Sequence, residues 1–181
     1  MKDQIWLIGF SGTGKSRLAR PTAAALDWQS VDLDSVIEQR AGDTITNVFR
    51  ARGEAEFRRI EAELVEETSQ LGNIVVATGG GAILAPANRE AMRRRGFVVC
   101  LDARPETILV RVRAPGGTVS DRPLLASDDD PLGRIVQLKG ERQPYYTQAD
   151  FIIQTDDLTP DQITHQILTA FREQTAVAGT T

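Results

Sequence analysis

From Gly9 to Ser16 the chain reads Gly-Phe-Ser-Gly-Thr-Gly-Lys-Ser, and more of its architecture can be argued from these residues than from any others. They match the pattern G-x-x-x-x-G-K-[ST], directly after an apolar run that predicts a strand and directly before a pattern that predicts a helix. Glycines let backbone N–H groups curl around phosphate oxygens, and the helix N-terminus adds unpaired donors and the positive end of its dipole. The stretch therefore predicts a nucleotide-phosphate site on a strand-loop-helix unit.

The residue types in this loop suit a nucleoside triphosphate. Lys15 brings a mobile positive charge to the β- and γ-phosphates, and the Ser16 hydroxyl is placed to bind Mg²⁺. The residues expected to hold the nucleotide are Gly12, Thr13, Gly14, Lys15, Ser16 and Arg17. An ordinary glycine-rich turn is the weaker alternative, given both the motif and its setting. The N-K-x-D tetrapeptide, with which a GTPase would read guanine, does not occur in the sequence.

Outward from the loop, short apolar runs alternate with helical patterns. The runs that predict strands are 4–8, 30–32, 73–77, 97–101 and 151–153. The patterns that predict helices are 15–26, 34–41, 44–52, 54–70, 86–95, 105–113, 132–143 and 160–173. This alternation predicts a three-layer α/β domain, in which helices cover both faces of a central parallel sheet of about five strands.

Residues 114–130 interrupt the alternation. They contain Pro-Gly-Gly and Asp-Asp-Asp runs and too little apolar periodicity for a regular element. A loop of this length inside a compact domain is usually functional or disordered, so we expect a mobile lid here. We expect one domain over residues 1–175, followed by a flexible tail at 176–181.

Composition excludes several classes of function. The 181 residues include 21 basic and 25 acidic side chains, a net charge of −4, and the basic residues are scattered among acidic ones, which argues against nucleic-acid binding. The apolar runs are strand-sized and no signal peptide is recognisable, so we expect a cytoplasmic protein without membrane contact. Cys100 is the single cysteine and is expected to be a buried, inert thiol. With His165 as the only histidine, a catalytic triad or a multi-histidine metal site is excluded.

Two carboxylates, Asp32 and Asp34, close the second predicted strand. Residues two apart in a strand point to the same face, and we expect this strand end to lie beside the nucleotide crevice. Mg²⁺ keeps several waters and binds through few carboxylates, whereas an attacking hydroxyl needs an acceptor for its proton. We therefore assign Asp32 to the metal and Asp34 to the acceptor substrate. The alternative is that Asp34 caps the following helix.

Two further segments indicate anion binding. The positions expected to face inward are Phe57, Ile60 and Leu64 of the 54–70 helix, and the same spacing extends to Leu71 just after it. Arg58 lies beside this face, and Glu61 is spaced to fix its guanidinium, although a simple surface ion pair is an equal alternative. Gly79, Gly80 and Gly81 follow the third strand, where they suggest close approach of a ligand to the main chain, or else a tight connection.

Taken together, these segments resemble the shikimate kinase family over nearly the whole chain. The matching motifs are Asp32/Asp34, F-R-x-x-E at 57–61, the glycines 79–81, R-P-L-L at 122–125 and E-R-x-P-x-Y at 141–146. The resemblance implies a nucleoside-monophosphate-kinase-type fold. It also implies that the γ-phosphoryl group of ATP, with Mg²⁺, is transferred to the 3-hydroxyl of shikimate in aromatic amino acid biosynthesis. We expect these small molecules as the only partners and a monomeric enzyme.

The resemblance also implies roles for individual residues. Shikimate would be bound by Asp34, Phe49, Phe57, Arg58, Gly79, Gly80, Gly81 and Arg142, of which the two arginines and the backbone at Gly80 and Gly81 would hold the carboxylate. Forked arginine donors suit a planar carboxylate, and a neutral sugar would leave them unpaired. Catalysis would rest on Lys15, on Asp34 as proton acceptor and on Arg122 as a lid arginine. Adenine would meet Arg113 or Arg111 and the segment 156–160.

Two rival functions follow from the same residues. A gluconate kinase shares the loop and the fold, but the segment Thr78-Gly79-Gly80-Gly81 stands where we would expect a more polar, lysine-bearing one. A non-catalytic domain that senses shikimate would be expected to have lost Lys15, Asp34 or Arg122, and the sequence has all three.

Overall fold

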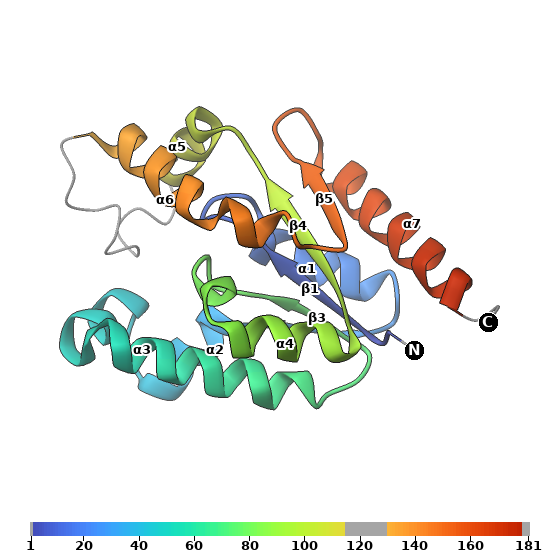
Figure 1. Ribbon diagram of the computed structural model, residues 1–181, viewed down its shortest axis with the longest axis horizontal. Helices are drawn as coiled ribbons and strands as arrows, with labels where there is room; N and C mark the ends of the chain where they lie inside the picture. Colours follow the sequence, from blue (N-terminus) through green and yellow to red (C-terminus); the bar gives the residue numbers. More distant parts are fainter. Residues whose placement is uncertain (1, 115–129, 179–181) are drawn as a thin grey trace.

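The structure, a computed structural model, describes residues 2–114 and 130–178. Within these residues one parallel sheet of five strands has the order β2-β3-β1-β4-β5 (Figure 1). The strands are β1 (Gln4–Ile8), β2 (Gln29–Asp32), β3 (Ile74–Ala77), β4 (Gly96–Asp102) and β5 (Phe151–Gln154). The predicted parallel α/β sheet is confirmed, and the predicted strands differ from these only at their ends.

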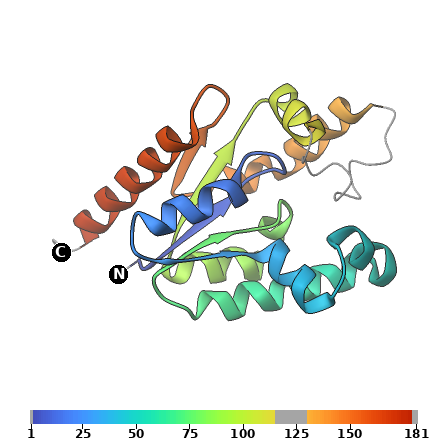
Figure 2. The same ribbon diagram turned by 180° about the vertical axis from the view of Figure 1, so that it is seen from behind.

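Helices cover both faces of the sheet, as Figures 1 and 2 show from opposite sides. They are α1 (Lys15–Ala24), α2 (Leu33–Ala41), α3 (Ile45–Ser69), the 3-10 helix η1 (Ala82–Leu84), α4 (Pro86–Arg95), α5 (Pro105–Arg113), α6 (Pro131–Tyr146) and α7 (Pro160–Ala178). Alternate strand residues face a core with α1 and α7 on one side, and a core with α2, α3 and α4 on the other. Burial on both faces explains why the strands are continuously apolar.

Helix α3 joins two helices that the sequence predicts separately, and Gly53 lies between them. Its φ of 79° and ψ of 167° are not helical, so the axis bends there. Such a conformation is accessible almost only to glycine. The expectation that Leu71 packs inward is wrong, because α3 ends at Ser69 and the Leu71 side chain is 48% exposed.

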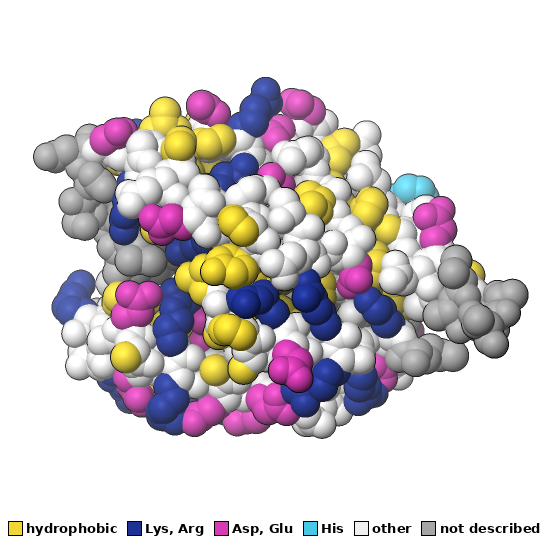
Figure 3. All heavy atoms as spheres, viewed as in Figure 1, with side chains coloured by type: hydrophobic (Ala, Val, Ile, Leu, Met, Phe, Trp, Pro, Cys, Tyr) yellow, Lys and Arg dark blue, Asp and Glu magenta, His cyan; other side chains and the backbone are white. Residues whose placement is uncertain are grey.

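The surface carries both charges in mixture. Dark blue and magenta side chains are interleaved on the face shown in Figure 3. Cys100 is buried in β4 as predicted, and burial raises the pKa of its thiol to about 12, so it stays protonated at neutral pH. Within 2–114 and 130–178 no helix is long and apolar enough to cross a membrane.

Candidate active site

The phosphate loop joins β1 to α1, as the sequence predicts. Gly12 and Gly14 have φ values of 79° and 101°, and Gly14 precedes the first residue of α1 without a side-chain cap. The backbone N–H groups of the first turn are thus left without a side-chain cap, the arrangement that anions bind. Lys15 is buried, and its Nζ donates to the carbonyl oxygens of Gly9 at 2.9 Å and Phe10 at 2.8 Å. Ser16 and Arg17 are exposed on the first turn of α1.

The loop is also packed against α5, which restricts its residues. A Cβ atom on Gly12 would stand 3.2 Å from the Val112 side chain, so a larger residue would push α5 away. The Thr13 hydroxyl donates to the carbonyl of Phe10 at 2.8 Å. The backbone N–H of Thr13 donates to the same carbonyl at 3.4 Å, so both groups of Thr13 stabilise the fold of the loop.

The two carboxylates after β2 do not lie on one strand face, which corrects the sequence prediction. The strand ends at Asp32, whose Oδ1 accepts from the backbone N–H of Ser35 at 3.3 Å and so caps α2. Asp34 lies in the first turn of α2 and lines the pocket described below. The cap is therefore Asp32 and not Asp34. β3 also separates β2 from β1, so β2 is an edge strand and the turn into α2 brings Asp34 to the site.

A pocket of about 520 Å³, open to solvent, lies beside the phosphate loop. Its lining comes from the loop, α2, both segments of α3, the loop after β3 and α6. The residues are Phe10, Ser11, Asp34, Ile45, Phe49, Phe57, Arg58, Glu61, Gly79, Gly80, Gly81, Leu138 and Arg142. Every residue that the sequence assigned to the acceptor substrate is among them. The lining combines aromatic rings with two arginines, which suits a small ring compound that carries a negative charge.

Arg58 is held at the pocket by acidic neighbours and by glycine. Its Nη1 donates to Oε2 of Glu61 at 2.7 Å, and its Nη2 lies 3.5 Å from Oε1 of Glu54. A Cβ on Gly81 would overlap the guanidinium, so glycine is required for this approach. The guanidinium carbon also lies 5.3 Å from the centre of the Phe57 ring. The spacing that could have been a plain surface pair thus fixes an arginine at the pocket wall.

Arg142 is buried and approaches the same pocket from α6. Its Nη1 donates to the Gly80 carbonyl at 3.1 Å, and the Tyr146 hydroxyl donates to the same oxygen at 3.0 Å. Its guanidinium carbon lies 5.1 Å from the centre of the Phe10 ring. These contacts tie α6 to the glycine loop and to the phosphate loop. In the sequence Tyr146 is only the last residue of the motif at 141–146. The structure shows that it is a second hydrogen-bond donor to Gly80.

Glu61 was not assigned to the site from sequence beyond its pairing with Arg58. Its side chain is buried, and Oε1 makes no hydrogen bond within the described residues. Burial raises the pKa of Glu61, Arg58 opposes this shift, and the nearby Asp34 adds to it. The i to i+3 spacing in the sequence indicates that Glu61 pairs with Arg58. It does not indicate that the Glu61 side chain is buried.

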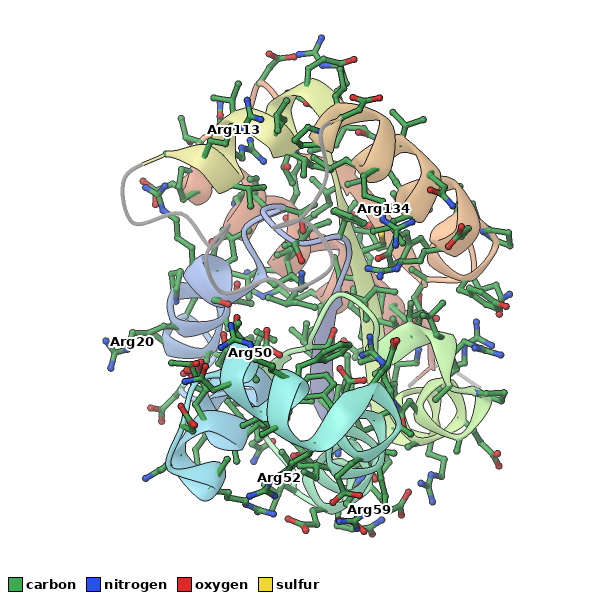
Figure 4. All side chains as sticks on the ribbon, turned by 90° about the vertical axis from the view of Figure 1, so that its left-hand side faces the viewer. Arg20, Arg50, Arg52, Arg59, Arg113 and Arg134 are labelled. Atoms are coloured by element: carbon green, nitrogen blue, oxygen red, sulfur yellow. The ribbon has the colours of Figure 1, made fainter. Side chains whose placement is uncertain are left out.

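Arg111 and Arg113, the two arginines expected near adenine, both lie on α5 but have different surroundings. Arg111 Nη1 donates to the Thr155 hydroxyl at 2.9 Å and Nη2 to the Thr155 carbonyl at 2.7 Å, directly before the segment 156–160. Arg113 is exposed at the end of α5 (Figure 4). Of the two arginines that the sequence left open, Arg111 is therefore the one that lies against the expected adenine segment.

Two predicted features have no structural test. Arg122 and residues 115–129 of the expected lid lie outside the described residues, as do residues 179–181 of the expected tail. Of the rest of that tail, residues 176–178 belong to α7. Residues 2–114 and 130–178 contain no group of three or more His, Cys, Asp or Glu that could hold a metal ion by themselves.

A family model, related sequences and solved structures all show similarity of this chain to shikimate kinases. The family model described as shikimate kinase matches residues 11–172. A shikimate kinase of Symbiobacterium thermophilum is 44% identical over 171 residues, which cover 94% of this chain and 97% of that protein. A solved structure of shikimate kinase from Acinetobacter baumannii in complex with shikimate has a TM-score of 0.89 at 32% identity, covering 96% of this chain and 95% of that one. Shikimate kinase from Aquifex aeolicus has a TM-score of 0.79 at 29% identity, with 96% and 98% covered.

Proposed function

The chain belongs to the shikimate kinase family, and from this we propose that it transfers the γ-phosphoryl group of ATP to the 3-hydroxyl of shikimate. The products are shikimate 3-phosphate and ADP, in the biosynthesis of aromatic amino acids. The observation that supports this best is the single pocket lining that joins Ser11 of the phosphate loop to Arg58, Arg142 and the glycine loop. A carboxylate bound by the arginines would leave the ring hydroxyls near the phosphate loop.

Each residue of the pocket has a part in the proposed reaction. Arg58, Arg142 and the backbone at Gly79–Gly81 orient the shikimate carboxylate, while Phe49 and Phe57 wall the ring. Arginine forks suit this because they bind a carboxylate with two parallel hydrogen bonds. Asp34 accepts the proton of the 3-hydroxyl as its oxygen attacks the γ-phosphorus and the bond to ADP breaks.

The nucleotide is held by the phosphate loop. The backbone N–H groups of Gly12–Ser16 surround the phosphates, and Lys15 Nζ exchanges its two loop carbonyls for phosphate oxygens. Arg111 packs on the adenine side, with Arg17 and Arg113 as further candidates. Arg122 is proposed from sequence alone, as an arginine in a lid over 114–130 that offsets charge on the transferring group.

Mg²⁺ fits the donor groups at this site. Ser16 has an exposed hydroxyl on the first turn of α1, and the cap by Asp32 uses only Oδ1, so Oδ2 can face a metal-bound water. A site with few protein ligands agrees with the preference of Mg²⁺ for water and phosphate oxygens. The ion would neutralise charge on the β- and γ-phosphates.

Two assays test the proposed function against its rivals. We expect ADP formation with Mg²⁺, ATP and shikimate, and a product phosphorylated at the 3-hydroxyl by NMR. Activity with gluconate and not with shikimate would instead favour a gluconate kinase. Calorimetric binding of shikimate without any ADP formation would favour a sensor domain.

We further propose that the enzyme is cytoplasmic and monomeric and has one domain over 1–175. Two observations agree with the cytoplasm: ATP is the phosphoryl donor, and Cys100, the single cysteine, is buried and needs no disulfide partner.

A further inference from the structure

We propose that Lys139 and Asp102 form a positioning pair that sets the orientation of α6 and so the affinity for shikimate. The inference rests on the proposed function and adds two residues that contact neither substrate in it. Lys139 lies on α6, three residues before Arg142, and Asp102 is the last residue of β4.

Lys139 and Asp102 form an ion pair that is largely buried. Lys139 Nζ lies 2.9 Å from Asp102 Oδ1, and the two side chains are only 17% and 10% exposed. Both carboxylate oxygens have further donors: the backbone N–H of Ala103 donates to Oδ1 at 2.9 Å, and Gln154 Nε2 donates to Oδ2 at 3.1 Å. The carboxylate is therefore fixed by β4 and β5, and Lys139 brings α6 to it.

The place of the pair in the fold gives it a function. The backbone of Asp102 also anchors Thr155, whose N–H and hydroxyl donate to its carbonyl at 2.8 and 2.9 Å. Thr155 in turn accepts two hydrogen bonds from Arg111 of α5. The carboxylate of Asp102 joins α6, which carries Arg142, to the sheet, whereas the backbone carbonyl that holds Thr155 and Arg111 is kept in a side-chain substitution. The helices α5 and α6 are also the described elements on either side of 115–129.

Helix α6 needs such an anchor. On its pocket side Arg142 and Tyr146 both donate to one acceptor, the Gly80 carbonyl, which fixes one end of the helix to the glycine loop. Lys139 adds a fixed point on the sheet before them. An ion pair that is mostly desolvated contributes little net stability, but removal of one partner leaves an uncompensated charge and displaces its surroundings. Displacement of α6 would move Arg142 away from the shikimate carboxylate.

The test compares Michaelis constants for the two substrates. Lys139→Met and Asp102→Asn are each expected to raise KM for shikimate about tenfold while KM for ATP stays within about twofold, a loss of about 1.4 kcal/mol in binding one substrate. Lys139→Arg, which keeps the charge, should recover most of the affinity. The double variant Asp102→Asn/Lys139→Met should lie closer to wild type than the product of the single effects, as expected for residues that act as a pair.

A matched control is available in Lys2, which makes an ion pair of 2.8 Å with Asp150 outside the pocket lining. Lys2→Met should leave both Michaelis constants unchanged. If Lys139→Met fails to accumulate, Lys139→Gln carries the same test. Wild-type KM for shikimate in these variants, or equal effects on both substrates, would overturn the inference. Wild-type enzyme that does not phosphorylate shikimate at all would instead count against the proposed function.

Discussion

Arg58 and Arg59 are neighbours in α3 with different surroundings, which makes them a matched pair for mutation. Arg58 faces the pocket and Glu61, whereas Arg59 is exposed and pairs with Glu56 at 2.7 Å. Loss of a hydrogen bond to a charged group costs about 1.5–3 kcal/mol, so Arg58→Ala should raise KM for shikimate by about 10- to 100-fold. Arg59→Ala should leave it unchanged. Steady-state kinetics check both, and equal affinities in the two variants would contradict the assignment of Arg58.

Glu61 gives a prediction about pH. Its pKa is raised in the folded state, mainly by burial. Between the unfolded and folded pKa values, the folded protein holds a proton that the unfolded chain has released. The free energy of unfolding of the wild type therefore falls as pH rises through this window, by at most about 1.4 kcal/mol per pH unit for one group.

Glu61→Gln removes this titration, so the variant should gain stability relative to wild type as pH rises above the unfolded-state pKa of about 4.3, and the gain should level off above the raised folded pKa. Urea denaturation at each pH measures the difference. Glu63→Gln, on the exposed side of the same helix, serves as the control. If the difference in unfolding free energy between Glu61→Gln and wild type stays constant with pH, burial does not raise the pKa of Glu61.

At the scale of elements, the bend in α3 lets one helix line two sides of the pocket. Ile45 and Phe49 come from the segment before Gly53, and Phe57 and Arg58 from the segment after it. Gly53→Ala places a side chain where φ is 79°, at a cost of about 1–3 kcal/mol, although space for the Cβ is open. We expect lower stability and a higher KM for shikimate, measured by thermal unfolding and kinetics.

Gly140 in α6 is the control for this experiment. A Cβ there also meets nothing within 4 Å, and its backbone φ is not positive. Gly140→Ala should stabilise the protein by about 0.5–1 kcal/mol, because alanine loses less entropy in a helix than glycine. Equal stabilities of the two alanine variants would mean that the bend is not maintained by Gly53.

The junction of β2 and α2 combines a helix cap with the proposed metal contact, and two substitutions of Asp32 separate these roles. Asp32→Asn keeps a capping oxygen for Ser35 and removes the charge, whereas Asp32→Ala removes both, at a cost of about 1 kcal/mol for the cap. If Asp32 serves Mg²⁺, both variants lose turnover, by about 10- to 100-fold, and only Asp32→Ala loses stability. Normal turnover of Asp32→Asn would leave Asp32 with a capping role alone.

The same junction explains what could and could not be predicted from the sequence. The phosphate loop, the strands and most helix bounds follow from local patterns, because glycines, apolar runs and helical periodicity act over short distances. That Asp34 reaches the pocket from a helix depends on where β2 ends and on the insertion of β3 beside β1, which no local pattern specifies. The Lys139–Asp102 pair likewise joins distant segments that only the fold brings together.

At the scale of the whole molecule, the parallel sheet gathers the site at one edge. The loops after β1 and β3 and the first turn of α2 all follow carboxyl ends of strands, and they meet at one pocket. Helix α6 adds Leu138 and Arg142 to the lining of the same pocket. This is the position where open α/β sheets bind ligands.

The charge of the molecule and the charge of its substrates lead to a last prediction. The protein has a net charge of −4, yet ATP and shikimate are both anions, so attraction must come from local positive groups. Figure 4 shows Arg50 on α3 and Arg134 on α6, and both helices contribute residues to the pocket lining. We expect kcat/KM for both substrates to fall as salt is raised, because screening shortens the range of these charges to about 8 Å at physiological ionic strength.

Arg50→Gln/Arg134→Gln should lower kcat/KM at low salt by about threefold to tenfold, weaken its salt dependence and leave kcat unchanged, since long-range charge affects encounter more than chemistry. Arg172→Gln removes a positive charge from α7, which Figure 1 shows at the opposite end of the molecule from the start of α6, and it should change none of these values. A double variant with the salt dependence of wild type would mean that the charges that attract the substrates are Lys15 of the phosphate loop and Arg58 and Arg142 of the pocket.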